Sequence, residues 1–154
     1  MSRGRTVALA AGTAAVVIAL DQVTKALVRG DIQPGESVRV TGFLHLVHVH
    51  NRGIAFGLAS GSGALVAVIA ALILAGLLAF FAANLSRRLV WLPTGLLAAG
   101  AVGNLVDRAR QGYVTDFVQL PHWPAFNLAD AAITIGVVAL IWVLEGPGRH
   151  RERD

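Results

Sequence analysis

Four aspartates stand among apolar residues and are the side chains of this sequence best suited to chemistry. They are Asp21, Asp107, Asp116 and Asp130. The chain is 55% hydrophobic and only 14% charged. An ionisable group inside an apolar span costs roughly 2.5 to 3.5 kcal/mol on insertion scales, and such groups usually have a function. Four acids of this kind in one short chain predict a polar site.

Asp116 and Asp130 could form a pair. Asp116 lies in an otherwise apolar tetrapeptide, and the segment that leads on to Asp130 contains two prolines and is short. We expect this segment to bring the two carboxyls face to face. A second interpretation of Asp130 stays open, because Asn127 stands three residues before it, at the spacing of a cap that starts a helix.

Two carboxyls in a partly dry pocket suit hydrolysis. They cannot both ionise easily, so one pKa rises and the pair holds a single proton. The ionised member can take a proton from a water that attacks a peptide carbonyl, while the protonated member donates to the carbonyl oxygen. The pair titrates as a unit, so neither proton is assigned to a named residue. This chemistry requires no metal, cofactor or nucleophilic side chain.

The other two acids have polar or cationic neighbours. Asp21 and Lys25 are four residues apart, the helical spacing at which opposite charges meet, which predicts an ion pair that anchors a helix end. Asn104 and Asp107 share one helical face, and Arg108 stands beside an acid that it could hold ionised. Both a structural network and a catalytic role for Asp107 are compatible with this pattern.

Other chemistries have weaker support. His45, His48 and His50 form a cluster, but on a strand only His48 and His50 share a face, so we interpret them as hydrated or interfacial histidines. The chain has no cysteine and no H-E-x-x-H motif, which removes thiolate sites and the usual zinc-protease ligands. Lys25 is the only lysine and faces Asp21, which disfavours a Ser-Lys dyad. We therefore expect no metal and no cofactor.

The elements that position these residues are apolar runs about 20 residues long, the length that spans a membrane. We predict an all-α membrane protein of one integral-membrane domain over residues 1–154. A small β-element at about 36–58 is expected between the first two helices, because that segment is rich in β-branched and aromatic residues. The predicted spans are about 6–27, 63–83, 89–106 and 126–144.

The arginines predict the orientation, since short cytoplasmic segments are enriched in Lys and Arg. Three very short segments carry a dense set of arginines, which places both termini in the cytoplasm and the long loops outside. The basic residues flank apolar runs and form no single stripe, which disfavours nucleic-acid binding. The dense set is Arg3, Arg5, Arg87, Arg88, Arg149, Arg151 and Arg153.

Five motifs in this order resemble the bacterial lipoprotein signal peptidases, also called signal peptidase II, over nearly the whole chain. Each motif alone is weak, but five in sequence on four spans are specific. One departure is Ala99, which stands where the family has the first glycine of its third motif. The matches are Asp21 to Lys25 with D-x-x-S/T-K, Asn51 to Phe56 with N-x-G-x-A-F, Ala99 to Arg108 with G-G-x-x-G-N-x-x-D-R, Val114 to Phe117 with V-x-D-F, and Phe126 to Asp130 with F-N-x-A-D.

The resemblance implies that Asp116 and Asp130 are the catalytic pair. The residues alone do not decide whether Asp107 or Asp116 partners Asp130; the family implies Asp116, and Arg108 would tend to keep Asp107 charged. The residues that the resemblance implies as substrate-binding or supporting are Asp21, Lys25, Asn51, Gly53, Asn104, Asp107, Arg108 and Asn127.

The implied function is an aspartic endopeptidase of the bacterial cell membrane. Its substrate would be a prolipoprotein carrying a diacylglyceryl-modified cysteine, cut just before that cysteine. We expect contact with membrane lipids, no nucleic acid, and a monomer. The rival interpretations are a small four-helix proton-coupled transporter, which should carry its acid near mid-helix, and a non-enzymatic membrane scaffold.

Overall fold

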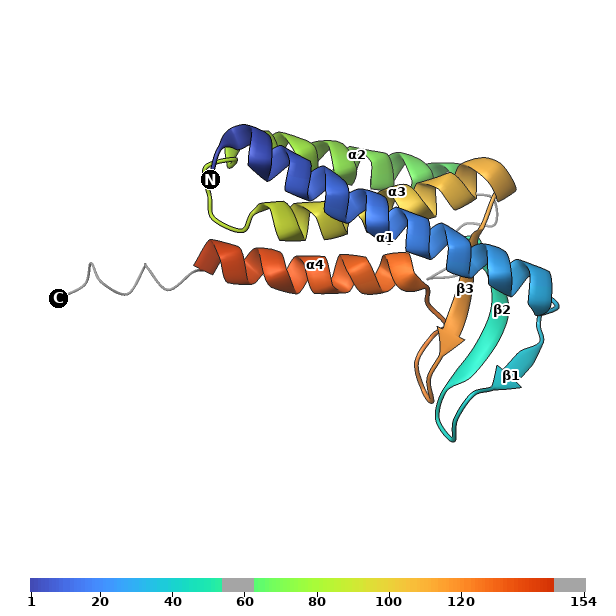
Figure 1. Cartoon of the computed structure of the whole chain (residues 1–154). Coiled ribbons are helices and arrows are strands. Elements are labelled where there is room, and N and C mark those ends of the chain that lie inside the picture. Colours follow the sequence, from blue (N-terminus) through green and yellow to red (C-terminus); the bar gives the residue numbers. More distant parts are fainter. Residues whose placement is uncertain (54–62, 146–154) are drawn as a thin grey trace.

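The computed structural model describes residues 1–53 and 63–145 (Figure 1). Four helices run alternately up and down, and a small sheet lies at one end of them. The N-terminus and the end of the last helix both lie at the opposite end. The helices are α1 (Arg3–Asp31), α2 (Gly63–Ala83), α3 (Trp91–Gln111) and α4 (Leu128–Glu145). The strands are β1 (Ser37–Arg39), β2 (His45–Asn51) and β3 (Val114–Gln119).

Three of the helices are long and apolar enough to cross a membrane: α1, Leu65–Ala83 of α2, and α4. The prediction of a mostly helical membrane protein is confirmed at this level. The predicted third span corresponds to α3, which does not meet the same criterion. Asp107, Arg108 and Arg110 in its last turns are the reason.

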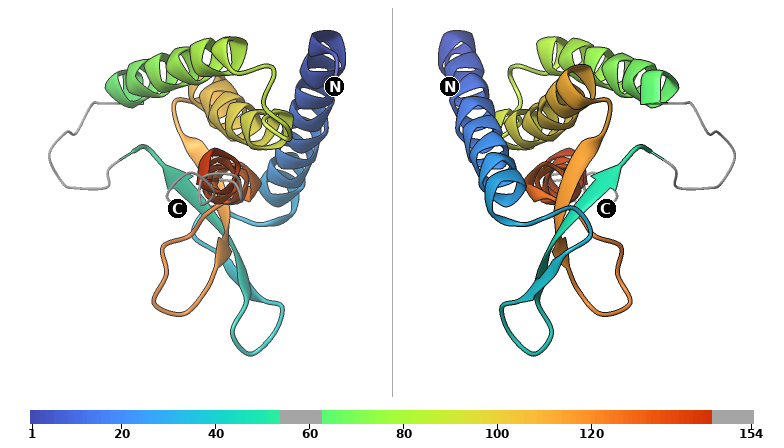
Figure 2. Two further views of the ribbon diagram at one scale, coloured as in Figure 1. Left: turned by 90° about the vertical axis from the view of Figure 1, so that its left-hand side faces the viewer. Right: turned by 90° about the vertical axis from the view of Figure 1, so that its right-hand side faces the viewer.

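Helix α3 tolerates polar residues because it is the central helix. It packs against α1, α2 and α4, and Figure 2 shows it between α1 and α2 with α4 beside it. Its buried side includes Gly95, Ala99, Gly100 and Gly103. A Cβ on Gly100 would collide with the carbonyl oxygen of Ala129 in α4. The small residues of α3 therefore let the helices approach closely.

Two of the helices, α1 and α3, extend further toward the sheet than predicted. α1 continues to Asp31, and its 29 residues span about 43 Å, more than the roughly 30 Å of hydrocarbon. α3 continues to Gln111 and ends at Gly112, which adopts φ 77° as a left-handed helix cap. Asp21 and Asp107 consequently lie inside their helices and not at the helix ends.

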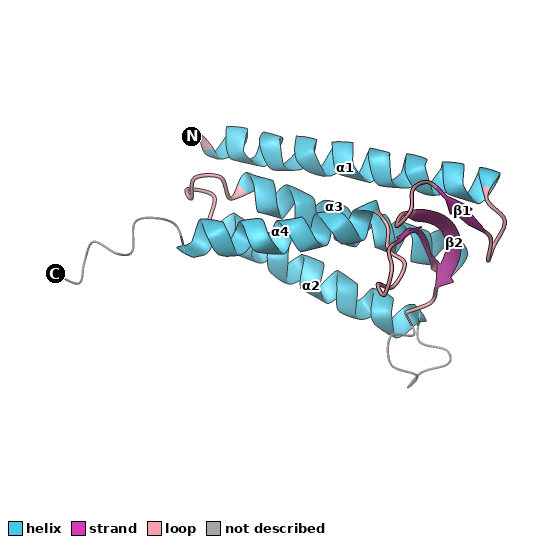
Figure 3. Ribbon diagram, turned by 90° about the horizontal axis from the view of Figure 1, so that it is seen from below, coloured by secondary structure: helices cyan, strands magenta, loops and turns pink. Residues whose placement is uncertain are grey.

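The sheet has three antiparallel strands in the order β1-β2-β3. The predicted β-element accounts for β1 and β2 only, and its residues from 54 onward lie outside the described part of the chain. The third strand is formed by residues between α3 and α4 and carries Asp116, in a segment for which no strand was predicted. Figure 3 shows the sheet lying across one end of the helices.

Candidate active site

The site lies where β3 meets the ends of α1, α3 and α4. β3 follows α3 after only two residues, Gly112 and Tyr113, and its first four residues are buried. This connection holds Asp116 near Asn104 of α3 and Asn127 at the start of α4. Asp116 is 2% exposed, and Asn127 is fully buried.

Asp116 and Asp130 are joined by amide groups. Asn127 donates from its side chain to Asp116 Oδ1 at 2.7 Å and from its backbone N–H to Asp130 Oδ2 at 3.1 Å. The Asn104 side chain donates to Asp130 Oδ1 at 2.8 Å, and Asn51 donates to Asp116 Oδ2 at 2.9 Å. Each of the four carboxylate oxygens therefore accepts one hydrogen bond, and the two acids belong to one network.

Asn127 and Asp130 also start α4. The backbone N–H of Asp130 donates to Asn127 Oδ1 at 3.0 Å, while the Asn127 N–H donates back to Asp130. This reciprocal pair is a capping box, so the capping interpretation is confirmed. It does not compete with a role in the site, because the remaining Asn127 donors and the second Asp130 oxygen face Asp116 and Asn104.

Lys25 occupies the centre of a second, charged cluster. Its Nζ lies 2.8 Å from Asp21 Oδ2 and 3.2 Å from Asp107 Oδ2, and all three side chains are at most 1% exposed. Nζ also donates to Asn104 Oδ1 at 3.0 Å. The predicted ion pair is confirmed, but it is buried and joins α1 to α3, so it does more than anchor a helix end.

The two clusters differ in charge compensation. Asp21 and Asp107 both contact Lys25, and Arg29 approaches Asp107 at 3.8 Å. Within residues 1–53 and 63–145, neither Asp116 nor Asp130 makes an ion pair. Asn104 connects the clusters, since its oxygen accepts from Lys25 while its amide donates to Asp130.

Arg108 does not pair with Asp107, which corrects the expectation that it keeps this acid charged. Its Nη1 donates to the backbone oxygen of Asn104 at 3.4 Å. Its Nε is buried and has no partner among the described residues. Its charge interacts with Asp130 more strongly than with Asp107. Arg108 therefore faces the site. Lys25 is the cation that contacts Asp107, in the position expected for Arg108.

Three contributors were missed in the sequence. Gln22 donates to Asp107 Oδ1 at 3.2 Å, the backbone N–H of Thr115 donates to Asp107 Oδ2 at 3.1 Å, and Arg29 donates to Thr115 Oγ1 at 3.1 Å. Arg29 could have been identified from the sequence, because it continues the four-residue spacing of Asp21 and Lys25 along one helical face. The contact of Thr115 with Asp107 depends on the fold, and nothing in the sequence indicated it.

Asn51 and Gly53 lie at the end of β2. The Gly53 N–H donates to Asn51 Oδ1 at 2.8 Å, which orients the Asn51 amide toward Asp116. Gly53 has φ 82°, and a Cβ there would come within 2.8 Å of Val66 in α2. Both the positive φ and the lack of space for a Cβ therefore require a glycine at this position. The rest of this motif, Ile54 to Phe56, lies outside the described residues.

Electrostatics set Asp116 apart. Burial raises the pKa of its carboxyl to about 6, from an ordinary value of 3.8. The charge of Asp130 acts in the same direction, whereas hydrogen bonds from Asn51 and Asn127 and the charge of Lys25 oppose the rise. A carboxyl with this pKa can exchange a proton near neutral pH, as a general acid or base must.

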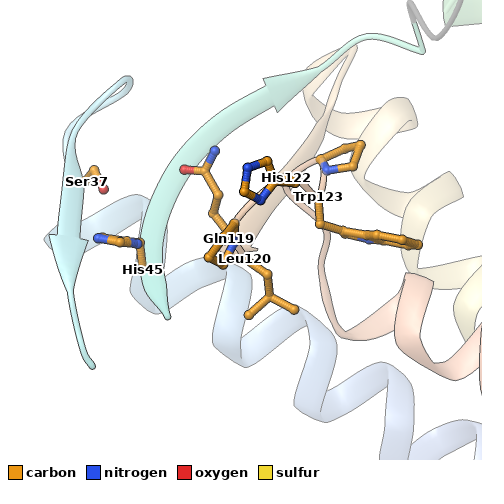
Figure 4. A pocket seen from close by; sticks show the side chains of 8 residues that line it. Ser37, His45, Gln119, Leu120, His122 and Trp123 are labelled. Carbon is orange, nitrogen blue, oxygen red and sulfur yellow. The ribbon is translucent and has the colours of Figure 1, made fainter. Parts of the chain in front are cut away.

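A separate pocket lies at the outer part of the sheet (Figure 4). It is lined by Ser37, His45, Gln119 and the loop that follows β3, where Trp123 is 63% exposed. His45 points into this pocket, while His48 and His50 are in contact with each other at 3.2 Å. The contact of His48 with His50 agrees with the prediction that these two histidines share a face. His45 pairs with Gln119 and His50 pairs with Thr115, four residues apart on β3, so His45 lies on the same face as His50 and the prediction that it points away was wrong.

Comparison with known proteins assigns the family. The model of the family described as Signal peptidase (SPase) II matches residues 13–145. The chain belongs to the signal peptidase II family. Its lipoprotein signal peptidase relative from Moorella thermoacetica is 44% identical over 145 residues, covering 92% of this chain and 95% of that protein. The one from Syntrophomonas wolfei is 40% identical over 144 residues, covering 93% and 97%.

Two solved structures of similar fold agree with this family assignment. One described as a bacterial membrane enzyme solved by the in meso method at 2.3 Å has a TM-score of 0.83 and 31% identity, covering 98% of this chain and 93% of that chain. A second, at 1.9 Å, has a TM-score of 0.82 and 33% identity, covering 94% of each. The protein is thus an aspartic peptidase with lipoprotein signal peptidase activity, processes prolipoproteins, and is a multi-pass bacterial membrane protein.

Proposed function

We propose that Asp116 and Asp130 are the catalytic pair of this peptidase. The observation that carries the proposal is the contrast between the two clusters. Asp21 and Asp107 are both in ion-pair contact with Lys25. Among the described residues, Asp116 and Asp130 have only amide partners. A pair that makes no direct ion pair can take up and release a proton, which the mechanism needs.

The proposed reaction uses a water molecule between the two carboxyls. The ionised carboxylate removes a proton from the water as its oxygen attacks the scissile carbonyl carbon, and the protonated carboxyl donates its proton to the carbonyl oxygen. The tetrahedral intermediate then collapses, the C–N bond breaks, and a proton passes to the departing amine. Asn104, Asn127 and Asn51 hold the carboxyl oxygens in place for these transfers.

Cleavage is proposed to occur just before the diacylglyceryl-modified cysteine of the prolipoprotein. All the site residues lie at the sheet end of the helices, so an apolar signal helix could lie along the bundle with its end at the carboxyls. Arg108, with an unpartnered buried Nε among the described residues, is placed to bind the substrate backbone near Asp130. Asp21, Lys25 and Asp107 support the pair from behind through Asn104.

We further propose four spanning helices, α3 included, in a monomer forming one integral-membrane domain with both termini in the cytoplasm. Lateral contact with α1, α2 and α4 lets α3 span despite its polar end. Both ends of the described chain lie opposite the sheet, as this orientation requires. Arg3, Arg5, Arg87 and Arg88 belong to that same end, which agrees with the enrichment of arginine in cytoplasmic segments.

The test is cleavage of a purified, lipid-modified preprolipoprotein by the native protein, Asp116→Asn and Asp130→Asn. We expect cleavage by the native protein alone. Asp107→Asn is the matched control, because it removes a buried acid that pairs with Lys25. It should weaken the enzyme but leave turnover measurable. Equal cleavage by Asp116→Asn or Asp130→Asn and the native protein would remove that residue from the mechanism.

A further inference from the structure

The pairing of β2 with β3 shifts by one residue inside β2. Leu46 pairs with Val118, but Val49 pairs with Asp116. Three steps along β2 therefore match two steps along β3, which places a one-residue β-bulge at Val47 and His48. Figure 1 shows the strong bend of β2, which is the usual consequence of a bulge.

This bulge decides which face of the sheet carries Asn51. Side chains alternate between the faces, so a one-residue shift moves every later side chain to the other face. With the bulge, Asn51 pairs with Val114. It therefore shares a face with Asp116, two residues further along β3, and donates to it at 2.9 Å. With regular pairing, His50 would take that position and Asn51 would point away from Asp116.

His48 holds the bulge on two sides. Its Nδ1 donates to the backbone oxygen of Ile32, directly after α1, at 2.8 Å. A carbonyl oxygen only accepts, so Nδ1 carries the proton. The backbone oxygen of His48 accepts from the Gly35 N–H at 3.0 Å, and the residue is only 4% exposed. The bulge is thus tied to the end of α1 and to the turn before β1.

His50 adds a second connection on the same face. With Nδ1 of His48 protonated, its Nε2 accepts from Nε2 of His50, 3.2 Å away. The His50 ring stacks on Tyr113, just before β3, with centroids 3.8 Å apart and the planes at 23°. These contacts fix β2 against β3 from the side opposite Asp116.

We infer that His48 is a positioning residue of this peptidase: by holding the β-bulge, it sets the register that brings Asn51 to Asp116. The inference rests on the proposed catalytic role of Asp116. It gives the histidine cluster a function that involves no metal. Without the His48 contact, regular pairing becomes more favourable, because a bulge disrupts the hydrogen-bond ladder.

The register can be tested without an activity assay, because the chain has no cysteine. The first pair, His50→Cys with Thr115→Cys, joins partners in the bulged register. The second pair, Val49→Cys with Thr115→Cys, joins partners only if the bulge is lost, since a disulfide needs neighbouring Cβ atoms on one face. We expect only the first pair to cross-link with His48 present. Adding His48→Ala should produce the second cross-link.

Kinetics test the link to catalysis. His48→Ala should lower kcat by up to about 100-fold, since a displacement of about 1 Å in an active site costs that much. KM should change far less. Asn51→Ala should have the same effect, and the double variant should be no worse than either. His48→Asn, whose amide can donate where Nδ1 does, should restore kcat. His45→Ala, on the same strand before the bulge, is the control and should leave kcat unchanged.

The outcomes separate this inference from the proposed function. An unchanged cross-linking pattern in His48→Ala, or additive effects of His48→Ala and Asn51→Ala, would overturn the positioning role. A shifted register with full cleavage by His48→Ala, Asn51→Ala and Asp116→Asn would instead overturn the catalytic role of Asp116. His48→Asn guards against misfolding, because a well-folded variant that lacks the histidine but keeps the donor must behave like the native protein.

Discussion

Replacing Asp116 by asparagine should change how stability depends on pH, in addition to abolishing cleavage. The folded-state pKa of Asp116 is about 6, above the ordinary 3.8 that applies in the unfolded chain. Between these two values the folded protein binds more protons than the unfolded one. The free energy of unfolding contributed by Asp116 therefore falls as pH rises from about 4 to above 6.

The size of this effect follows from the pKa difference. One pKa unit corresponds to roughly 1.4 kcal/mol, so a rise from 3.8 to about 6 corresponds to about 2 to 3 kcal/mol. Asparagine carries no charge and lacks this pH-dependent component. Asn51 and Asn127 donate to different oxygens of Asp116, and asparagine replaces one of these oxygens by an NH2 group that cannot accept, but that loss does not depend on pH. The lost hydrogen bond lowers stability by the same amount at every pH, so it does not change the slope of stability against pH.

The assay is unfolding of both proteins in the same detergent at several pH values between 4 and 8. The stability of the native protein minus that of Asp116→Asn should fall by about 2 to 3 kcal/mol over this range, equivalent to a difference in Tm on the order of 5 to 10 °C. Histidine titrations are common to both proteins and cancel. Asp31→Asn, at an exposed carboxylate at the end of α1, controls for the loss of one negative charge and should keep full cleavage.

Two results would refute this reasoning. A difference curve that stays flat from pH 4 to 8 would mean that Asp116 is not destabilised as an anion in the folded protein. A sloping curve combined with undiminished cleavage would mean that the perturbed carboxyl is not part of the reaction.

Two further predictions concern the packing behind the site. Lys25→Met should lower the free energy of unfolding by about 3 to 5 kcal/mol, because it leaves two buried carboxylates without their cation. Denaturation in detergent measures this change. An unchanged stability would contradict the buried ion-pair cluster. Gly100→Ala should lower the free energy of unfolding by about 1 to 3 kcal/mol and reduce cleavage, because its Cβ meets the Ala129 backbone. Gly12→Ala is the control and should be neutral or slightly stabilising, because the space at its Cβ is open. Equal behaviour of the two alanine variants would argue against close contact of α3 and α4.

Short-range features of the site were readable in the sequence because they depend on spacing along one element. The ion pair of Asp21 with Lys25 follows from four residues of helix, and the capping box of Asn127 with Asp130 follows from three. Each of these predictions was confirmed, although the length of α1 and α3 was underestimated because their polar ends have partners in the bundle.

Long-range contacts were not readable in this way. Asn51 reaches Asp116 across 65 residues, and Lys25 reaches Asn104 across 79. The prediction that Arg108 holds Asp107 failed for this reason, since neighbours in sequence point to different sides of a helix. Lys25, far away in sequence, takes that place.

Composition and local spacing are properties of the chain, and they were enough to predict the apolar helices, the acids they carry and the family. Three features could be known only from the folded protein: Asp116 lies on a strand, Lys25 pairs with both Asp21 and Asp107, and a bulge at His48 turns Asn51 toward Asp116. Strand register depends on contacts between segments distant in sequence, and a shift of a single residue reverses the face on which a side chain lies.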